Sequence, residues 1–214
     1  MKFILSLFAS VLIALAWLLP VHYRPWVTYT GELFAFLSLF TLTAIFLQQK
    51  LKLPVLTLPL VALAFIPLLQ WILGLGFFFS VALISSLFVF AFWLSMVLGY
   101  NLSFTQKDRE QAFASFSYVL LITGFITGLM AIAQWLTIEN HIPGIANLRS
   151  NRPYANFAQP NNMATFLILS LMASLYLFEK SKLKAWILSL CSLTILIALV
   201  LSQSRTSWVV CILF

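Results

Sequence analysis

The sequence predicts an all-α, polytopic integral membrane protein, a helical bundle of about seven complete spans and the start of an eighth. Hydrophobic residues make up 63% of the 214 positions and charged residues only 8%, with a mean hydropathy of +1.05. So few charged side chains cannot cover a water-soluble surface. The apolar runs recur at about the 20-residue length that a helix needs to cross a bilayer. They are also continuous, whereas the strands of a membrane barrel would alternate polar and apolar residues.

The first apolar run, residues 3–20, is expected to be a retained helix. A cleaved signal peptide is the alternative, because Lys2 precedes the run and Ala14-Leu15-Ala16 resembles a cleavage site. The remaining expected spans follow in order: 31–47, 54–73, 77–99, 112–137, 161–178 and 185–201. An eighth run begins near Trp208 and reaches only Phe214, too short to cross, so we expect the chain to be the first part of a longer protein.

The basic residues predict the orientation of these spans. With the N-terminus in the cytoplasm, every lysine falls on the cytoplasmic side, as the positive-inside rule requires: Lys2, Lys50, Lys52, Lys107, Lys180, Lys182 and Lys184. The formal charge of +7 therefore reflects topology and contact with anionic lipid. It does not indicate nucleic-acid binding, because no basic patch with interleaved aromatic residues faces a soluble compartment.

The outer side receives four arginines and no lysine: Arg24, Arg149, Arg152 and Arg205. The positive-inside bias works against these positions, so they need another explanation. The planar guanidinium group matches phosphate and carboxylate oxygens in a bidentate way that an ammonium group cannot. The set therefore favours anion recognition, with interfacial anchoring or pairing with Glu32 and Glu139 as the alternative.

The connection from about 138 to 160 concentrates polar residues, with a turn at Pro143-Gly144 and no recognisable regular element. Pro160 suits the first position of the next helix, which puts Gln159 just outside it and Asn161 and Asn162 in its first turn. The unpaired N–H groups of a helix start attract phosphate oxygens. The tract therefore predicts an anion-binding site at the start of this helix. The equal alternative is a capped helix in which the Asn and Gln side chains bond to loop carbonyls.

The same tract resembles the arginine-aromatic-Asn-Phe-x-Gln-Pro-Asn pattern of bacterial protein O-oligosaccharyltransferases, the protein glycosylation ligases. The stretch that carries the resemblance is Arg152-Pro153-Tyr154-Ala155-Asn156-Phe157-Ala158-Gln159-Pro160-Asn161-Asn162-Met163-Ala164. At Asn162 many members carry histidine, so this sequence lacks a titratable group there. Two more stretches are similar to the family's first outer loop and to its Ser-Arg segment: Pro20-x-His22-x-x-Pro25-Trp26 with Glu32, and Ser202-Gln203-Ser204-Arg205-Thr206.

The resemblance implies transfer of a preassembled glycan from undecaprenyl diphosphate to a serine or threonine of a periplasmic protein, such as a pilin-like acceptor. It also implies the bacterial inner membrane, with the arginine-rich motif facing the periplasm, and no cofactor or metal. Residues 1–201 would form the N-terminal transmembrane domain, with the motif near 149–164, and residues 202–214 would begin an O-antigen ligase/polymerase domain. The family's catalytic histidine would lie beyond Phe214, so this chain alone is expected to be inactive.

The resemblance and the chemistry together assign the candidate site residues. Arg152 and Arg205 are expected to bind the diphosphate, with Arg149 and Arg24 as weaker candidates. Four amides would position phosphate or sugar oxygens: Gln159, Asn161, Asn162 and Asn156. His22 and Glu32 are weak candidates, since loop packing and an ion pair explain them equally simply. The two cysteines, Cys191 and Cys211, lie in apolar runs and are expected to be inert.

Other functions remain open at this stage. An O-antigen ligase would pass the glycan to lipid A-core, and an O-antigen polymerase to another lipid-linked repeat. A transporter or flippase should show repeated halves and broken helices with polar residues near the bilayer midplane, and neither pattern is visible. A non-catalytic remnant that only binds the lipid-linked glycan is the last alternative.

Overall fold

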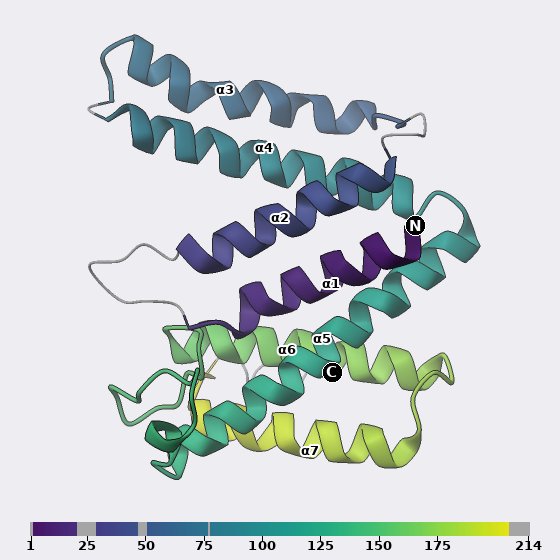
Figure 1. The fold of residues 1–214 in the computed structure, drawn as a ribbon, viewed down its shortest axis with the longest axis vertical. Helices are drawn as coiled ribbons and strands as arrows, with labels where there is room; N and C mark the ends of the chain where they lie inside the picture. The colour runs from purple at the N-terminus through teal and green to yellow at the C-terminus, as the bar shows by residue number, and fades with distance from the viewer. Residues whose placement is uncertain (1, 21–28, 47–50, 77, 206–214) are drawn as a thin grey trace. The chain divides into compact units, whose positions relative to one another are not determined.

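The computed structural model describes residues 2–20, 29–46, 51–76 and 78–205 (Figure 1). All regular structure in these ranges is helical, so the predicted all-α fold is confirmed. The helices are α1 (Lys2–Leu18), α2 (Tyr29–Phe46), η1 (Val55–Thr57), α3 (Leu58–Ile72), α4 (Phe79–Leu102), α5 (Gln106–Trp135), η2 (Glu139–His141), α6 (Pro160–Glu179) and α7 (Ala185–Ser202).

Each of the first seven predicted spans corresponds to one α-helix, and the expected eighth span lies outside the described residues. Five segments are both long and apolar enough to cross a membrane: Val55–Ile72, which consists of η1 and α3, and the helices α4, α5, α6 and α7. The apolar parts of α1 and α2 are shorter, Ile4–Leu18 and Thr30–Phe46. The order of elements therefore follows the sequence prediction closely.

One predicted boundary and one predicted irregular connection were wrong. Helix α5 begins at Gln106, well before residue 112, because Thr105 caps a charged first turn that the apolar pattern does not reveal. The Thr105 hydroxyl accepts a hydrogen bond from the Asp108 N–H at 3.1 Å and donates to the Asp108 carboxylate at 2.6 Å. In addition, the connection after α5 is not wholly irregular, since η2 forms a single 3-10 turn within it.

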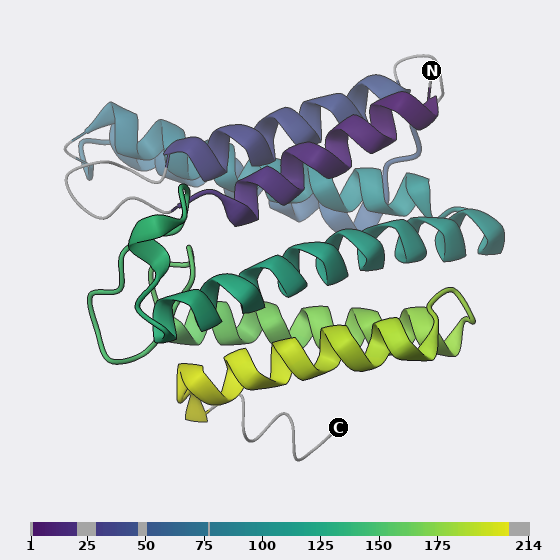
Figure 2. The same cartoon turned by 60° about the horizontal axis from the view of Figure 1, so that its bottom comes forward.

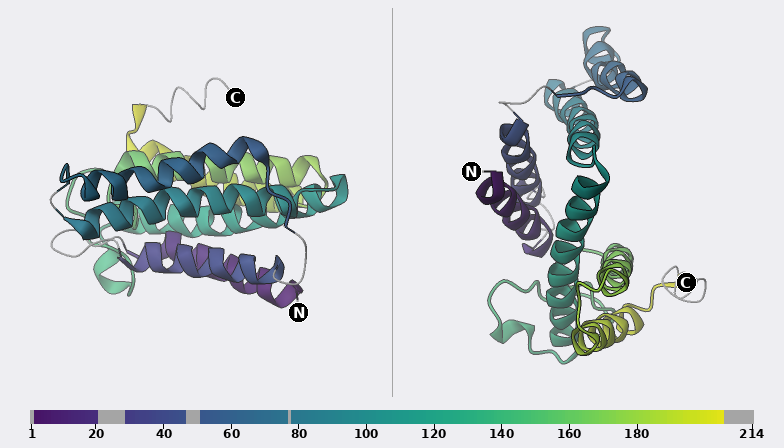
Figure 3. Two further views of the ribbon diagram at one scale, coloured as in Figure 1. Left: turned by 90° about the horizontal axis from the view of Figure 1, so that it is seen from above. Right: turned by 90° about the vertical axis from the view of Figure 1, so that its right-hand side faces the viewer.

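The chain divides into two compact units. The first comprises Met1–Ala9 and Phe36–Ala112. Within it, α3 and α4 lie side by side and antiparallel (Figures 1 and 3). Asn101, near the end of α4, fixes the segment before η1 by pairing with the Lys52 N–H and C=O, both at 2.9 Å. The Lys52 ammonium lies 3.6 Å from the centre of the Phe104 ring, a cation–π contact.

The second unit comprises Ser10–Ala35 and Phe113–Phe214. Here α6 and α7 lie side by side, and α5 touches both (Figure 2). Gly124 of α5 directly faces Ser170 of α6, and a Cβ placed at Gly128 would lie 3.2 Å from the Thr194 side chain of α7. Small residues at such positions let helix backbones approach closely, which is how membrane helices associate.

The core of this unit also contains part of the connection between α5 and α6. Ala155, from that connection, is fully buried among residues of all three helices: Ala131, Met163, Ala164, Leu167, Ile195, Ala198 and Leu199. Phe157 packs on Phe166 of α6 with ring centroids 4.8 Å apart, and Trp17 of α1 packs on the same ring at 5.1 Å. The connection is therefore part of the packed structure and lies where α5 ends, α6 begins and α7 ends (Figure 2).

Candidate anion-binding site

A buried glutamine at the end of α5 organises the connection that follows it. Gln134 is fully buried, and its side-chain oxygen accepts hydrogen bonds from the N–H groups of Tyr154 at 3.0 Å and Ala155 at 2.7 Å. Its amide nitrogen donates to the carbonyls of Ala146 at 2.7 Å and Ala155 at 2.9 Å. The side chain thereby uses both lone pairs and both N–H groups.

Gln134 was not among the site residues predicted from the sequence, although a signal was present. A lone amide at the end of a long apolar run is costly in hydrocarbon unless it has partners. Those partners lie in the connection, as many as 21 positions along the chain. Spacing along the sequence could not reveal them.

Asn156 is a second internal anchor and is 1% exposed. Its side-chain oxygen accepts the Ala146 N–H at 2.8 Å, and its amide donates to the carbonyls of Leu18 at 2.6 Å and Gly144 at 2.7 Å. It thereby ties the last turn of α1 to the turn at Pro143-Gly144, which the sequence predicted correctly. These bonds hold the connection together, and the predicted contact of Asn156 with phosphate or sugar oxygens stays a prediction.

Glu139 and Tyr154 complete the internal bonding of the connection. The buried Glu139 accepts the Leu148 N–H at 3.3 Å, and the Tyr154 hydroxyl donates to the Asn147 carbonyl at 2.6 Å. The other Glu139 carboxylate oxygen is buried and has no hydrogen-bond partner among the described residues. The alternative in which Glu139 pairs with an outer-side arginine is therefore not observed in this part of the chain.

The start of α6 follows the sequence prediction. Gln159 is the N-cap residue with extended backbone, Pro160 occupies the first helical position, and Asn161 and Asn162 lie in the first turn. The side chains of Gln159, Asn161 and Asn162 are exposed, and Gln159 makes no capping hydrogen bond. The first N–H groups of this helix therefore carry the partial positive charge that favours an anion.

A pocket of about 420 Å³ lies beside this helix start. Its lining combines Arg149 and Ser150 with Tyr154, Ala158, Gln159 and Pro160. The volume falls in the range of roughly 300–1,000 Å³ that is usual for small-molecule sites. Two of the predicted site residues, Arg149 and Gln159, thus share one pocket with the end of a helix.

Arg152 is placed differently, outside this lining. It is half-buried, and its Nε donates to the Ser202 carbonyl at the end of α7 at 2.8 Å. One terminal nitrogen donates to the Asn161 side-chain oxygen at 3.2 Å. A cation at the C-terminal end of a helix is favoured by the helix dipole. Arg152 therefore links the end of α7 to the start of α6.

Arg205 follows the turn that ends α7. Gln203 adopts a left-handed conformation with φ of 50°, and the Ser204 N–H contacts the Ser202 hydroxyl at 3.3 Å. Arg205 is exposed, and no hydrogen bond is found for its guanidinium within the described ranges. It lies three positions along the chain from the Ser202 carbonyl that Arg152 contacts.

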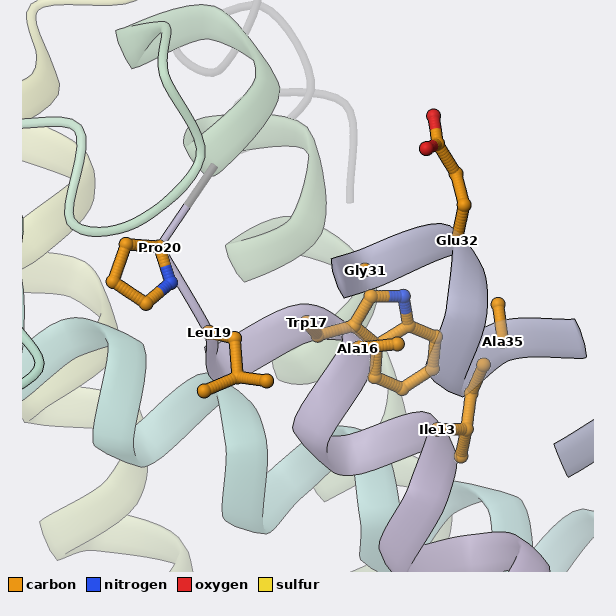
Figure 4. Close-up of a pocket in the computed structure, with 8 residues that line it drawn as sticks. All are labelled: Ile13, Ala16, Trp17, Leu19, Pro20, Gly31, Glu32 and Ala35. Atoms are coloured by element: carbon orange, nitrogen blue, oxygen red, sulfur yellow. The ribbon is translucent and has the colours of Figure 1, made fainter. Parts of the chain in front are cut away.

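The remaining candidates are Arg24, His22 and Glu32. Arg24 and His22 lie outside the described residues. Glu32 lines a separate pocket of about 250 Å³, whose other lining residues are apolar or small: Ile13, Ala16, Trp17, Leu19, Pro20, Gly31 and Ala35. Figure 4 shows its carboxylate turned away from the apolar side chains of that pocket. Three or more His, Cys, Asp or Glu residues placed to hold a metal occur nowhere in the described ranges.

Comparison with known proteins finds similarity over part of the connection and α6, and over nearly the whole chain. Residues 153–178, which run from the end of the connection through most of α6, match the family described as protein glycosylation ligase. The chain is 50% identical over 209 residues, 98% of its length, to the general O-oligosaccharyltransferase of Acinetobacter baylyi (strain ATCC 33305 / BD413 / ADP1). It is 29% identical over 184 residues, 85% of its length, to the ComP-specific O-oligosaccharyltransferase of the same organism.

The chain spans 37% of the first relative's length and 33% of the second's. No solved structure is significantly similar to it. The resemblance to protein glycosylation ligases, predicted from the Arg152–Ala164 tract, is confirmed.

Proposed function

From the premise that this chain is a homologue of bacterial O-oligosaccharyltransferases, we propose that it binds the lipid-linked glycan in an enzyme of that type. The glycan would arrive on undecaprenyl diphosphate and pass to a serine or threonine of a periplasmic protein. The chain would lie in the bacterial inner membrane with its N-terminus in the cytoplasm and the start of α6 facing the periplasm. The lysine distribution supports this orientation.

One observation carries the proposal: a pocket at the start of α6 that is lined by Arg149 and Gln159. A helix N-terminus supplies unpaired N–H groups and partial positive charge, and an arginine adds a full charge with a fork of donors. A diphosphate presents the oxygens that such a site binds. Asn161 and Asn162, exposed in the first turn, would contact the neighbouring phosphate or sugar oxygens.

The reaction gives these groups a role in the transition state. The acceptor hydroxyl attacks the anomeric carbon of the first sugar and gives up its proton to a general base. The bond from that carbon to the diphosphate oxygen breaks, and negative charge grows on the leaving diphosphate. Donors already aimed at that oxygen stabilise the charge without reorganising. We assign this role to Arg149, with Arg205 as the second charge at the end of α7. Arg152 holds α6 and α7 in the required arrangement and adds its charge from there.

Binding to the chain in lipid nanodiscs tests the proposal. A charge-assisted hydrogen bond contributes about 1.5–3 kcal/mol, so Arg149→Ala should weaken binding of undecaprenyl-diphosphate-linked oligosaccharide about 10- to 150-fold. Lys182→Ala, which removes an exposed charge near the other end of α6, is the matched control and should bind normally. Undecaprenol, which lacks the diphosphate, should not compete. Equal affinities of Arg149→Ala and the unaltered chain would refute the assignment.

The acceptor requires a second experiment. The chain can replace the matching part of the A. baylyi general O-oligosaccharyltransferase, and the products can be separated by glycan-specific blotting. Modification of a pilin-like protein supports protein glycosylation. Modified lipid A-core would support the O-antigen ligase alternative, and extended glycan repeats would support the polymerase.

A further inference from the structure

Gln134 is a buried polar residue that the proposed reaction does not use directly, and its contacts lead to the pocket. We propose that Gln134 is a positioning residue for the anion pocket and sets the wall formed by Tyr154 and the N-cap Gln159. This inference rests on the proposed function, since it concerns the same pocket. Gln134 itself does not line the pocket.

A continuous series of hydrogen bonds connects Gln134 with Gln159. The Gln134 side-chain oxygen accepts the Tyr154 N–H at 3.0 Å, and the Tyr154 carbonyl accepts the Phe157 N–H at 2.9 Å. The Phe157 carbonyl then accepts the Gln159 N–H at 2.7 Å. The end of α5 is thereby joined to Gln159, the N-cap of the helix start that would receive the anion.

The backbone of this segment is strained and depends on such support. Ala155 and Ala158 have φ values of 49° and 62°, in the left-handed region that residues other than glycine rarely adopt. Gln134 contacts both the N–H and the C=O of Ala155, the first of the two strained residues. Strained conformations persist when surrounding contacts determine them, and they concentrate at ligand sites.

Only an amide of this length supplies the bonds that are observed. A glutamate at position 134 would keep the shape and the accepting oxygen, but it would place a second oxygen against the carbonyls of Ala146 and Ala155. The segment from Tyr154 to Gln159 would then move away from α5. Because the series of bonds ends at Gln159, we expect lost affinity for the diphosphate rather than only a lower melting temperature.

The test measures affinity and thermal stability of the full chain in nanodiscs, with undecaprenyl-diphosphate-linked oligosaccharide as the probe. Gln134→Glu and Gln134→Leu should weaken binding roughly 10- to 100-fold, the range usual for residues that orient direct ligands. The control is Thr123→Val, another fully buried residue of α5, whose hydroxyl bonds only within its own helix. Its binding should match that of the unaltered chain.

A double variant separates positioning from general destabilisation. The double variant combines Gln134→Glu with Tyr154→Leu. If Gln134 acts through the wall of the pocket, this double variant should bind no more weakly than whichever single variant binds more weakly. Fully additive losses would overturn the proposal, and so would normal binding by Gln134→Glu. Should Gln134→Leu fail to fold, Gln134→Glu makes the comparison. If Arg149→Ala weakens binding but the Gln134 variants bind normally, only the positioning role of Gln134 fails. If Arg149→Ala itself binds normally, the proposed function fails.

Discussion

Gly124 should tolerate no side chain, because Ser170 of α6 occupies the space that a Cβ would enter. A Cβ built on Gly124 would overlap both the Cβ and the Oγ of Ser170. Ser170 is fully buried, and its hydroxyl is bonded to the Phe166 carbonyl at 2.9 Å, so its short side chain cannot swing away. Overpacking of this kind costs about 1–3 kcal/mol. Alanine regains about 1 kcal/mol in helix propensity, which leaves a net loss of up to about 2 kcal/mol for Gly124→Ala and makes it about 1–3 kcal/mol worse than the same change at an open helix position.

Thermal unfolding in detergent measures this loss, and the chain offers a matched control. A Cβ at Gly99 of α4 meets nothing within 4 Å, so Gly99→Ala should be neutral or slightly stabilising. Removing the obstructing side chain should rescue the first variant. Gly124→Ala combined with Ser170→Gly should therefore show a favourable coupling of about 1–3 kcal/mol. If Gly124→Ala is as harmless as Gly99→Ala, or if the two changes are simply additive, α5 and α6 do not meet at these residues.

Two further predictions concern the scaffold of the site. Arg152→Lys removes the guanidinium group, whose several N–H donors reach both the Ser202 carbonyl and the Asn161 side chain. Because this group is half-exposed, the free energy of unfolding measured by denaturant titration should fall by only about 1 kcal/mol. An unchanged midpoint would contradict the link between α6 and α7. Asn156→Ala leaves three part-buried backbone partners, in the connection and at the end of α1, without this side chain. The loss should cost about 2–4 kcal/mol and speed hydrogen exchange of the Ala146 amide. Slow exchange in that variant would show that other bonds hold the connection.

The spans were predictable because bilayer thickness fixes both the length and the apolar character of a crossing helix. The start of α6 was predictable for a local reason, since proline suits the first helical position and Gln159 precedes it. The start of α5 was not, because a Thr105 cap and a charged first turn extend that helix beyond its apolar residues. Hydropathy records where a helix is apolar and does not record where its hydrogen bonds begin.

The arginines show the limit of grouping residues by type. Arg149 and Arg152 are three positions apart and formed one predicted set, yet only Arg149 lines the pocket. Arg152 instead contacts Ser202, fifty positions along the chain. The segment between them is not helical, so its turns decide where each side chain lies. Those turns depend on tertiary bonds to Gln134, which no local pattern encodes.

Hydrogen bonding divides the amides of this tract into two kinds. An amide at the boundary of a hydrocarbon layer must find partners, either within the protein or in a ligand or water. Gln134 and Asn156 have all of theirs inside the fold, so their substitution should act first on the shape of the connection. The side chains of Gln159 and Asn162 are exposed and make no hydrogen bond within the described part of the chain. Arg149 lines the same pocket as Gln159, so a guanidinium group lies beside this helix start, and this arrangement favours a diphosphate there.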